Sequence, residues 1–261
     1  MLQIESRASE RVKALVRLRD SALERREKGA FFAEGLRLCT DIAGVQPALE
    51  AYCTRAALAA HPQLAALADE TALISDSVAE KLAGTKNTQG VFCVFRLPQP
   101  LRTVRPGGRY VALEHVQDPA NVGALLRSAA AFGFEGALLC GGCADPFSQK
   151  ALRASMGAAV KLGIARYEDA PQMAGALRAA GVPLVAAALR DSVPLADARA
   201  DDARGVAVLV GNEGNGLTDE AVRAADVAVR IPMAPGVESL NAAVAGGVLL
   251  WHFRGGACPQ A

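Results

Sequence analysis

The feature that most constrains the fold is an alternation of short apolar runs and amphipathic stretches between residues 109 and 261. Strands that alternate with helices along a chain form a parallel sheet with helices on both faces. The strand candidates are 111–114, 136–139, 162–166, 184–187, 206–210 and 227–231. Helices are expected to begin near Pro119, Pro146, Pro171, Thr218 and Leu240. The pattern therefore predicts an α/β domain built on a parallel sheet.

A smaller α/β domain is predicted before it. Helical stretches fall near 10–28, 33–42, 55–68 and 77–81, and strand candidates fall near 49–53, 72–74 and 91–95. Three prolines and a Gly-Gly pair within residues 96–110 are typical of a linker. The expected organisation is a domain at 1–98, a linker at 99–108 and a second domain at 109–261.

Composition narrows the class of protein. Hydrophobic residues make up 51% and charged residues 21% of the chain, which excludes wholesale disorder. No apolar run approaches the roughly 18 residues of a membrane span, and the first residues show no apolar secretory region. A cytoplasmic protein with no membrane partner is expected. Residues 1–30 hold eight basic and five acidic side chains, a pattern that fits either a solvated helix face or a surface for nucleic acid.

The cysteines give no strong signal of metal binding. Cys140 and Cys143 have CxxC spacing, but no second such pair follows and His115 is the nearest histidine in sequence. We interpret all six as small core or loop residues, and expect no metal. They are Cys39, Cys53, Cys93, Cys140, Cys143 and Cys258.

The first segment of interest runs from Glu114 to Phe134. Asp118 followed by Pro119 is a favourable helix start, with aspartate as the N-cap and proline in the first turn. Apolar residues at 122, 125, 126 and 129 predict the buried stripe of this helix, and Arg127 falls on another face. On its own, this pattern is equally that of an ordinary amphipathic helix with a surface arginine.

The second segment, from Val206 to Val222, joins an apolar strand to a glycine-rich turn. Ligands bind at the carboxyl ends of parallel strands in such proteins. The spacing G-x-x-G-x-G of Gly211, Gly214 and Gly216 is not the dinucleotide fingerprint, and no P-loop lysine follows. Glu213 would repel a pyrophosphate and suits a cationic or hydroxyl-rich ligand.

The third segment runs from Val229 to Trp251. Ser239 is the predicted N-cap of an apolar helix that contains Gly246 and Gly247. Each glycine costs a helix roughly 1 kcal/mol relative to alanine, so close packing against a neighbour is expected there. Tight helix–sheet packing without a ligand would also explain the segment.

Together the three segments resemble one family, the SpoU class of the SPOUT methyltransferases. The resemblance lies in N-V-G-A-L-L-R-S-A (121–129), L-V-G-N-E-G-N-G-L (209–217) and I-P-M-A-P-G-V-E-S-L-N-A-A-V-A (231–245), which occur in the family's order. R-A-S-M-G-A (153–158) resembles a further family stretch. F-F-A-E-G-L-R-L (31–38) and T-K-N-T-Q-G-V (85–91) are similar to the family's substrate-binding domain.

The resemblance implies a SPOUT fold with a deep trefoil knot, S-adenosylmethionine as cofactor and a homodimer with its active site near the interface. It implies methylation of a ribose 2′-hydroxyl in structured RNA, with ribosomal RNA as the expected substrate and tRNA as the alternative. The expected cofactor-binding residues are Leu209, Gly211, Gly216, Ile231, Met233 and Leu240. The expected catalytic residues are Arg127, Asn121, Glu213, Ser239 and Asn241.

The expected chemistry is attack of the ribose 2′-oxygen on an activated methyl group, which needs alignment and charge stabilisation but no metal. A guanidinium stays protonated, so Arg127 is expected to act as a fixed cation and not as a base. Asn121 is expected to position the ribose or Arg127, and Glu213 is expected to orient the same network of groups.

Three other readings remain open. One is a catalytically inactive RNA-binding protein on the same fold, and a second is methylation of a base. The third is a nucleotide-dependent oxidoreductase, against which the glycine spacing argues.

Overall fold

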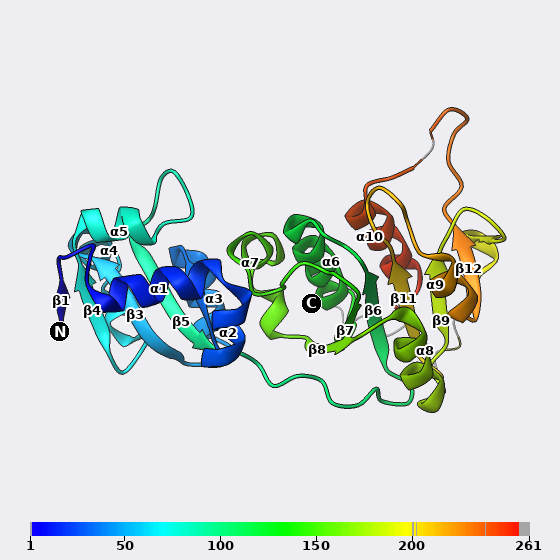
Figure 1. The fold of residues 1–261 in the computed structure, drawn as a ribbon, viewed down its shortest axis with the longest axis horizontal. Coiled ribbons are helices and arrows are strands. Elements are labelled where there is room, and N and C mark those ends of the chain that lie inside the picture. Colours follow the sequence, from blue (N-terminus) through cyan, green and yellow to red (C-terminus); the bar gives the residue numbers. More distant parts are fainter. Residues whose placement is uncertain (1, 200, 202, 238, 256–261) are drawn as a thin grey trace. The chain divides into compact units, whose positions relative to one another are not determined.

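The structure is a computed structural model that describes residues 2–199, 201, 203–237 and 239–255. It divides into two compact units: residues 1–98 with 147–160 form unit 1, and residues 99–146 with 161–261 form unit 2. Figure 1 shows both. Within the described ranges, no helix has the length and apolar character needed to cross a membrane. Cys258 lies outside the described residues.

Unit 1 is built on a mixed five-stranded sheet with the order β1-β4-β3-β5-β2. Strands β1, β4 and β3 are parallel, and β5 runs antiparallel to both β3 and β2. The strands are β1 (Gln3–Ile4), β2 (Ala30–Glu34), β3 (Ala48–Thr54), β4 (Thr71–Ile74) and β5 (Val91–Arg96). The helices are α1 (Glu10–Asp20), α2 (Ala22–Lys28), α3 (Leu36–Ala43), α4 (Arg55–Ala60) and α5 (Asp76–Leu82), with a 3₁₀ turn, η1 (Pro62–Ala66).

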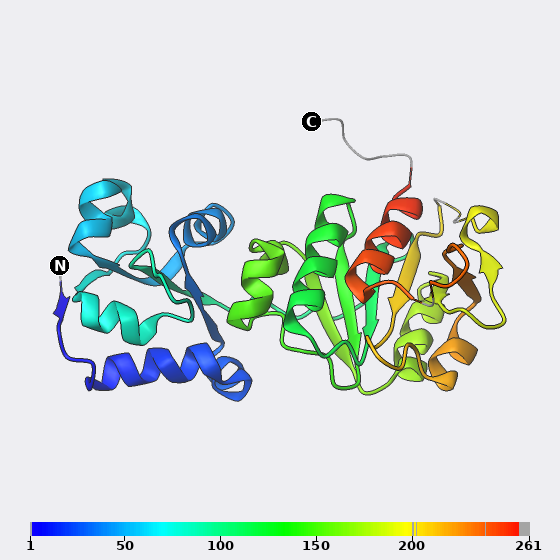
Figure 2. The same cartoon turned by 90° about the horizontal axis from the view of Figure 1, so that it is seen from above.

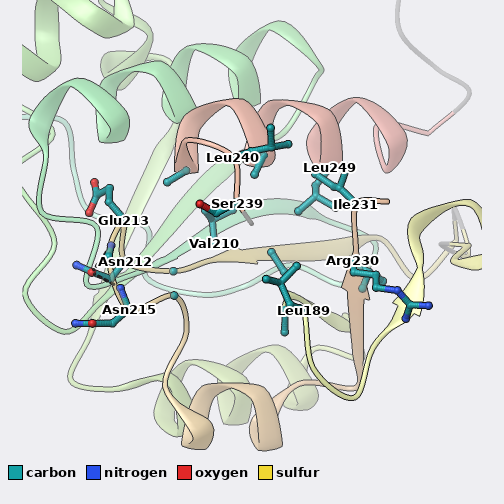
Figure 3. A pocket seen from close by; sticks show the side chains of 18 of the residues that line it. Leu189, Val210, Asn212, Glu213, Asn215, Arg230, Ile231, Ser239, Leu240 and Leu249 are labelled. Atoms are coloured by element: carbon teal, nitrogen blue, oxygen red, sulfur yellow. Dashed lines mark hydrogen bonds between the residues drawn. The ribbon is translucent and has the colours of Figure 1, made fainter. Parts of the chain in front are cut away.

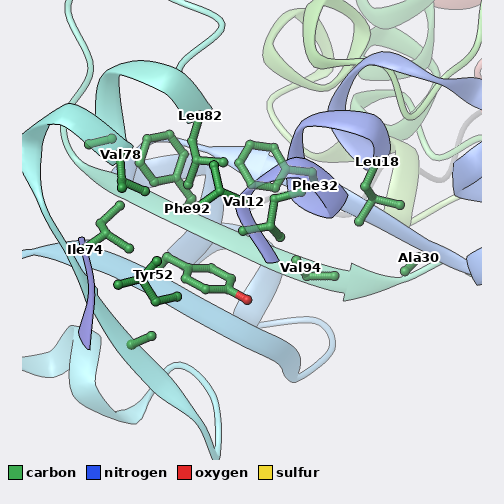
Figure 4. Packing of buried hydrophobic residues seen from close by; sticks show 14 residues of the cluster. Val12, Leu18, Ala30, Phe32, Tyr52, Ile74, Val78, Leu82, Phe92 and Val94 are labelled. Carbon is green, nitrogen blue, oxygen red and sulfur yellow. The ribbon is translucent and has the colours of Figure 1, made fainter. Parts of the chain in front are cut away.

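The core of unit 1 lies where α1 and α5 cover one face of this sheet (Figure 4). Phe32 and Phe92, from the paired strands β2 and β5, stack with ring centroids 5.6 Å apart. Val12 and Leu82 reach them from the helices and are fully buried. Their burial explains why an apolar face is needed on each of these elements.

Three predictions for unit 1 were wrong in detail. Residues 30–34 form a strand, and the helix predicted at 33–42 begins only at Leu36, because pairing with β5 overrides local helix propensity. The helix predicted at 10–28 is two helices, divided at Ser21, whose extended backbone caps α2. The helix predicted at 55–68 ends at Ala60, and a 3₁₀ turn begins at Pro62, a residue that cannot donate a helical hydrogen bond.

Residues 147–160 belong to unit 1 although they lie between two strands of unit 2 in sequence. They contain α7 (Gln149–Ser155) and the 3₁₀ turn η2 (Ala158–Val160). The Phe147 ring lies 5.2 Å from that of Phe31. Gly157 has a φ of +75° and lies so close to Ile42 that an added Cβ would stand 3.1 Å from its Cγ1. No sequence pattern assigned this segment to unit 1.

Unit 2 is a seven-stranded sheet with the order β10-β12-β9-β11-β6-β7-β8, in which every strand pair is parallel. The strands are β6 (Arg109–Glu114), β7 (Gly136–Cys140), β8 (Gly163–Tyr167), β9 (Leu184–Ala187), β10 (Val193–Pro194), β11 (Val206–Val210) and β12 (Val227–Arg230). The helices are α6 (Pro119–Ala131), α8 (Ala170–Ala179), α9 (Asp219–Ala224) and α10 (Ala242–His252), with a 3₁₀ turn, η3 (Leu195–Asp197). Helices lie on both sides of this sheet (Figure 2).

The parallel sheet with helices on its faces is confirmed, and six of its strands lie at or within a residue or two of the predicted positions. The helix predicted near Pro146 is an exception, because α7 belongs to unit 1. The two-residue strand β10 was not predicted. The buried stripe of α6 is confirmed, since Val122, Leu125, Leu126 and Ala129 are all fully buried. Its N-cap is also confirmed, because the Asp118 side chain accepts a hydrogen bond from the Ala120 amide.

Two helix starts differ from prediction. α7 begins at Gln149, capped by Ser148, and not near Pro146. The predicted N-cap Ser239 was wrong: α10 is capped by Asn241, whose Oδ1 accepts hydrogen bonds from the amides of Ala243 (2.9 Å) and Val244 (3.2 Å). Asn241 directly precedes the helix, and its side chain satisfies two otherwise unpaired amides of the first turn.

Candidate functional site

A pocket of about 310 Å³ lies at the carboxyl ends of β9, β11 and β12 (Figure 3). Three segments that follow these strands form most of its wall, namely 187–189, 210–216 and 229–233. The remainder comes from Ser239, Leu240 and residues of α10, among them Leu249. The chain therefore surrounds the pocket with turns and one helix, as expected for a ligand site in a parallel α/β sheet.

The glycine-rich turn after β11 is folded back on itself. The backbone amides of Asn212 and Gly216 each donate to the other's carbonyl oxygen at 3.0 Å. A Cβ on Gly211 would overlap the backbone of Gly216 and Leu217, and Gly216 has a φ of +70°. Both glycines are thus required by the turn itself. This is a different reason from the cofactor contact suggested by the sequence.

Asn212 fixes the shape of this turn. Its Oδ1 accepts from the amides of Gly214 (2.9 Å) and Asn215 (3.0 Å), and its Nδ2 donates to the carbonyl oxygen of His115 at 2.9 Å. Asn212 was not expected as a site residue from the sequence, although asparagine commonly stabilises turns through its side chain. It ties the turn to the chain that follows β6.

A chain of hydrogen bonds joins the three segments singled out in the sequence. Asn241 Nδ2 donates to Asn121 Oδ1 at 3.1 Å, and Asn121 Nδ2 donates to Glu213 Oε1 at 2.9 Å. Because Asn241 Oδ1 already accepts from two amides of α10, its Nδ2 must face Asn121. That contact in turn directs the Asn121 amide group toward Glu213. The orientation of all three side chains is therefore fixed by their partners.

Glu213 also accepts two backbone hydrogen bonds at the start of α6. The amides of Gln117 and Asp118 donate to its carboxylate at 3.3 and 3.2 Å. Partial burial acts to raise the pKa of Glu213, but the hydrogen bonds from Asn121 and from backbone amides outweigh it and hold the pKa below its usual value. The side chain is thus a carboxylate that orients its donors.

Glu114 is a second carboxylate near the turn, and it was not expected as a site residue from the sequence. It is 4% exposed at the end of β6. Its oxygens accept from the amide (2.9 Å) and the hydroxyl (2.8 Å) of Thr218, the N-cap of α9. The sequence did contain a signal for Glu114, because it is the last residue of a predicted strand, and ligand sites form at the carboxyl ends of parallel strands. Glu114 holds the far end of the glycine-rich turn.

The structure places the expected site residues in four kinds of position. Seven line the pocket: Gly211, Glu213, Gly216, Ile231, Met233, Ser239 and Leu240. Asn121 and Asn241 lie in the hydrogen-bonded chain beside it. Leu209 does not line the pocket, because its side chain is fully buried in the core of the sheet. Arg127 is exposed on α6, where it has no hydrogen bond or ion pair with any described residue.

The 187–189 segment of the pocket wall was also not expected from the sequence. It directly follows β9, so the rule that neighbouring parallel strands end at the same edge could have found it. Arg230 lines the pocket too, but its guanidinium donates to the carbonyl oxygen of Ser192 and points away from the cavity (Figure 3).

The cysteines of the described residues are core or near-core residues, as interpreted from sequence. Burial raises the pKa of Cys140 to about 12, and burial also raises the pKa of Cys143. Thiols with raised pKa values are poor nucleophiles and poor metal ligands. Within the described residues, no group of three or more His, Cys, Asp or Glu side chains is arranged to hold a metal ion.

The fold and the pocket define an α/β protein that binds a small ligand in turns at the carboxyl edge of a parallel sheet. The chain belongs to the SpoU rRNA methylase family, whose model matches residues 108–251. Residues 9–93 match the MRM3-like substrate binding domain.

Curated relatives include methyltransferases of bacteria. An uncharacterized tRNA/rRNA methyltransferase of Synechocystis sp. is 37% identical over 70% of this chain and 66% of its own length. The 23S rRNA (guanosine(2553)-2′-O)-methyltransferase of Bacillus subtilis is 30% identical over 70% of this chain and 72% of its own length. The matched region thus spans about two thirds of the length of these relatives.

Similar solved structures cover nearly the whole chain. The AdoMet-bound rRNA methyltransferase from Sinorhizobium meliloti has a TM-score of 0.85, with 33% identity and 97% of each chain covered. The SpoU methyltransferase AviRb from Streptomyces viridochromogenes, in complex with AdoMet, has a TM-score of 0.83 and 25% identity. That comparison covers 94% of this chain and 97% of the other.

Proposed function

We propose that the protein transfers a methyl group from S-adenosylmethionine to a ribose 2′-hydroxyl of structured RNA, and that this RNA is ribosomal. The observation that carries the proposal is the hydrogen-bonded chain Asn241–Asn121–Glu213 at the edge of the pocket. It links all three segments that resemble the family's motifs. The methyltransferases of Bacillus subtilis and Sinorhizobium meliloti support the choice of RNA.

The pocket fits the proposed cofactor. Its volume of about 310 Å³ lies within the range of small-molecule sites, roughly 300–1,000 Å³. Its wall combines backbone groups with apolar side chains such as Ile231 and Leu249, and it includes the carboxylate Glu213 but no cation directed inward. Such a wall suits a positively charged sulfonium attached to a nucleoside better than it suits a phosphate.

Arg127 is the proposed catalytic residue. When bound, S-adenosylmethionine supplies a methyl group that the positive sulfonium has already activated. Arg127 stabilises the negative charge that develops on the ribose 2′-oxygen, and because a protonated guanidinium cannot accept a proton, the hydroxyl proton leaves to water. Methyl transfer to this oxygen would break the carbon–sulfur bond and leave neutral S-adenosylhomocysteine. The exposure of Arg127 and its lack of a partner among the described residues leave it available to the RNA.

The remaining residues hold the reacting groups in place. Asn121 is 8% exposed, and its fixed amide orientation makes it the centre of this framework. Glu213 and Asn241 hold Asn121 from two sides. Ser239 lies in the pocket wall, from which its hydroxyl would contact substrate or cofactor. Alignment of this kind is a large part of the barrier reduction in a group transfer between two bound partners.

The deciding experiment has two parts. Isothermal titration should show binding of S-adenosylhomocysteine and none of NAD. Mapping of 2′-O-methyl groups in RNA from cells with and without the gene should then reveal a lost site in ribosomal RNA. Loss of a tRNA site instead would make tRNA the substrate. Binding without any lost site would favour an inactive RNA-binding protein.

We also propose a homodimer. Val244, Val248 and Trp251 project at helical spacing from α10 and are 54%, 39% and 52% exposed. Phe132, the C-cap of α6, packs edge-on against Trp251, with ring centroids 5.4 Å apart, and extends this apolar strip. A second copy of the chain would cover it.

A trefoil knot formed by the C-terminal chain is part of the same proposal. Its support is the family membership and the return of α10 across β11 to pack on α6. Tracing the chain path through residues 205–252 in a crystal of the cofactor complex tests it.

A further inference from the structure

A second group of polar contacts lies in unit 1, beneath the loop of residues 84–90, which projects between α5 and β5 (Figure 1). Glu34, at the end of β2, is only 5% exposed. Its Oε2 accepts from the amide of Gly84 at 2.8 Å, and its Oε1 accepts from the hydroxyl of Thr85 at 2.6 Å. A buried carboxylate with two such bonds fixes the point where the loop begins.

Glu34 is supported in turn by α7, the helix that unit 1 receives from the middle of the chain. Arg153 Nη1 lies 4.0 Å from Glu34 Oε2 and donates to Gln149 Oε1 at 3.3 Å. Gln149 Nε2 donates to the carbonyl oxygen of Phe32 at 2.7 Å. A Cβ on Gly84 would stand 3.6 Å from Arg153 Nη1, so the base of the loop rests directly on α7.

The other end of the loop is anchored as well. Gln89 Oε1 accepts from the amide of Leu36 at 2.9 Å, and the carbonyl oxygen of Gly90 accepts from the amide of Thr54 at 2.9 Å. Gly90 has a φ of +67°. Between these anchors Lys86 is exposed and forms no ion pair with any residue that the structure describes.

The basic helices at the N-terminus are less available. Arg11 donates to the hydroxyl of Tyr52, Lys13 pairs with Glu10, and Arg17 pairs with Glu24. Arg25 is buried, and Arg19 donates to the carbonyl oxygens of residues 81–83 at the end of α5. Most of the basic side chains seen in the sequence of residues 1–30 are therefore engaged within unit 1.

We propose that the 84–90 loop is a preformed RNA contact that presents Lys86 to a phosphate group, and that Glu34 and Arg153 are its positioning residues. This inference rests on the proposed function, which makes RNA the substrate. A loop held at both ends loses less conformational entropy on binding than a free one, so its lysine binds more tightly. The segment 147–160 thus contributes to substrate binding although it follows β7 of the methyltransferase sheet.

The test measures methyl transfer from tritiated S-adenosylmethionine to in vitro transcribed 23S rRNA. Lys86→Ala should raise KM for the RNA several-fold and leave kcat unchanged. It should also lower the slope of log affinity against log salt by about 0.9, the value for one lost phosphate contact with a duplex. Lys28→Ala is the matched control, an exposed lysine of the same unit, and should change neither quantity.

Arg153→Gln should raise KM as Lys86→Ala does, and the double variant should show no further rise, because both act on one contact. Arg153→Lys should restore part of the affinity. Normal KM and salt slope for Lys86→Ala, an equal effect of Lys28→Ala, or additive effects in the double variant would overturn the proposal. If Arg153→Gln strongly lowers the melting temperature, the KM and salt slope of Lys86→Ala alone decide whether the proposal holds. No transfer by the wild-type protein would instead count against the proposed function.

Discussion

Arg127 carries the sharpest expectation at the scale of single residues. Arg127→Ala should lower kcat about 10²- to 10³-fold, the range seen when one group that stabilises developing charge is removed. Affinity for S-adenosylhomocysteine, measured by titration calorimetry, should stay within twofold because the side chain does not line the pocket. The free energy of unfolding should change by less than about 0.5 kcal/mol, as for other exposed residues. Near-normal turnover would refute the proposed role.

Glu213 should make stability depend on pH in a defined direction. Its pKa is lower in the folded protein than in the unfolded chain, so its contribution is present above the unfolded pKa, about 4.3, and lost as pH falls through the folded value. The difference in melting temperature between wild type and Glu213→Gln should be largest near neutral pH. It should shrink below about pH 4, and a difference that grows on acidification would contradict the hydrogen-bond assignment.

Motif resemblance provided the expected site residues, but it did not provide their contacts. Asn121 is 92 residues from Glu213 and 120 residues from Asn241 in the chain, and no local periodicity relates such positions. The N-cap of α10 shows the limit at shorter range. Ser239 and Asn241 are both good capping residues, and only the backbone path, which leaves Asn241 next to the first turn, decides between them.

At the scale of elements, α10 packs so closely on α6 that its two adjacent glycines should respond differently to substitution. A Cβ on Gly246 would overlap Leu125, whereas a Cβ on Gly247 would stand 3.8 Å from Ser128 Oγ, an ordinary contact. Gly246→Ala should therefore destabilise the protein by about 1–3 kcal/mol. Gly247→Ala should be neutral or stabilise it by up to about 1 kcal/mol through helix propensity. Urea unfolding of both variants checks this, and equal effects would contradict the packing.

The strands of unit 2 could be predicted because a strand covered on both faces is apolar along its whole length. Val206–Val210 is fully buried and appears in the sequence as an uninterrupted apolar run. β2 was missed for the opposite reason. Its five residues run directly into α3, and what makes them a strand is pairing with β5, far along the chain.

At the scale of the whole molecule, the apolar strip on α10 leads us to expect a dimer in solution. Trp251→Glu should place a charge in the middle of that interface and shift the mass measured by light scattering toward the monomer. Leu23→Glu is a suitable control, because Leu23 is 58% exposed on α2, a helix of the other unit. A monomeric wild-type protein, or equal masses for wild type and Trp251→Glu, would remove the basis for the proposed interface.

Unit 1 should depend on the segment 147–160 for stability. In a fragment of residues 1–98, Phe31 and Ile42 lose their contacts with Phe147 and Gly157 and become exposed. We expect this fragment to unfold at a lower urea concentration than one to which 147–160 is joined through a Gly/Ser linker. Equal midpoints would show that the segment adds nothing.

This arrangement has a consequence for how such enzymes diversify. A substrate-binding module attached by a single linker can be exchanged by one recombination event at that linker. Here the N-terminal unit includes residues encoded in the middle of the gene, between two strands of the catalytic sheet. A successful exchange must replace both stretches together. RNA specificity in this lineage would therefore change more readily by substitution within the unit than by swapping it.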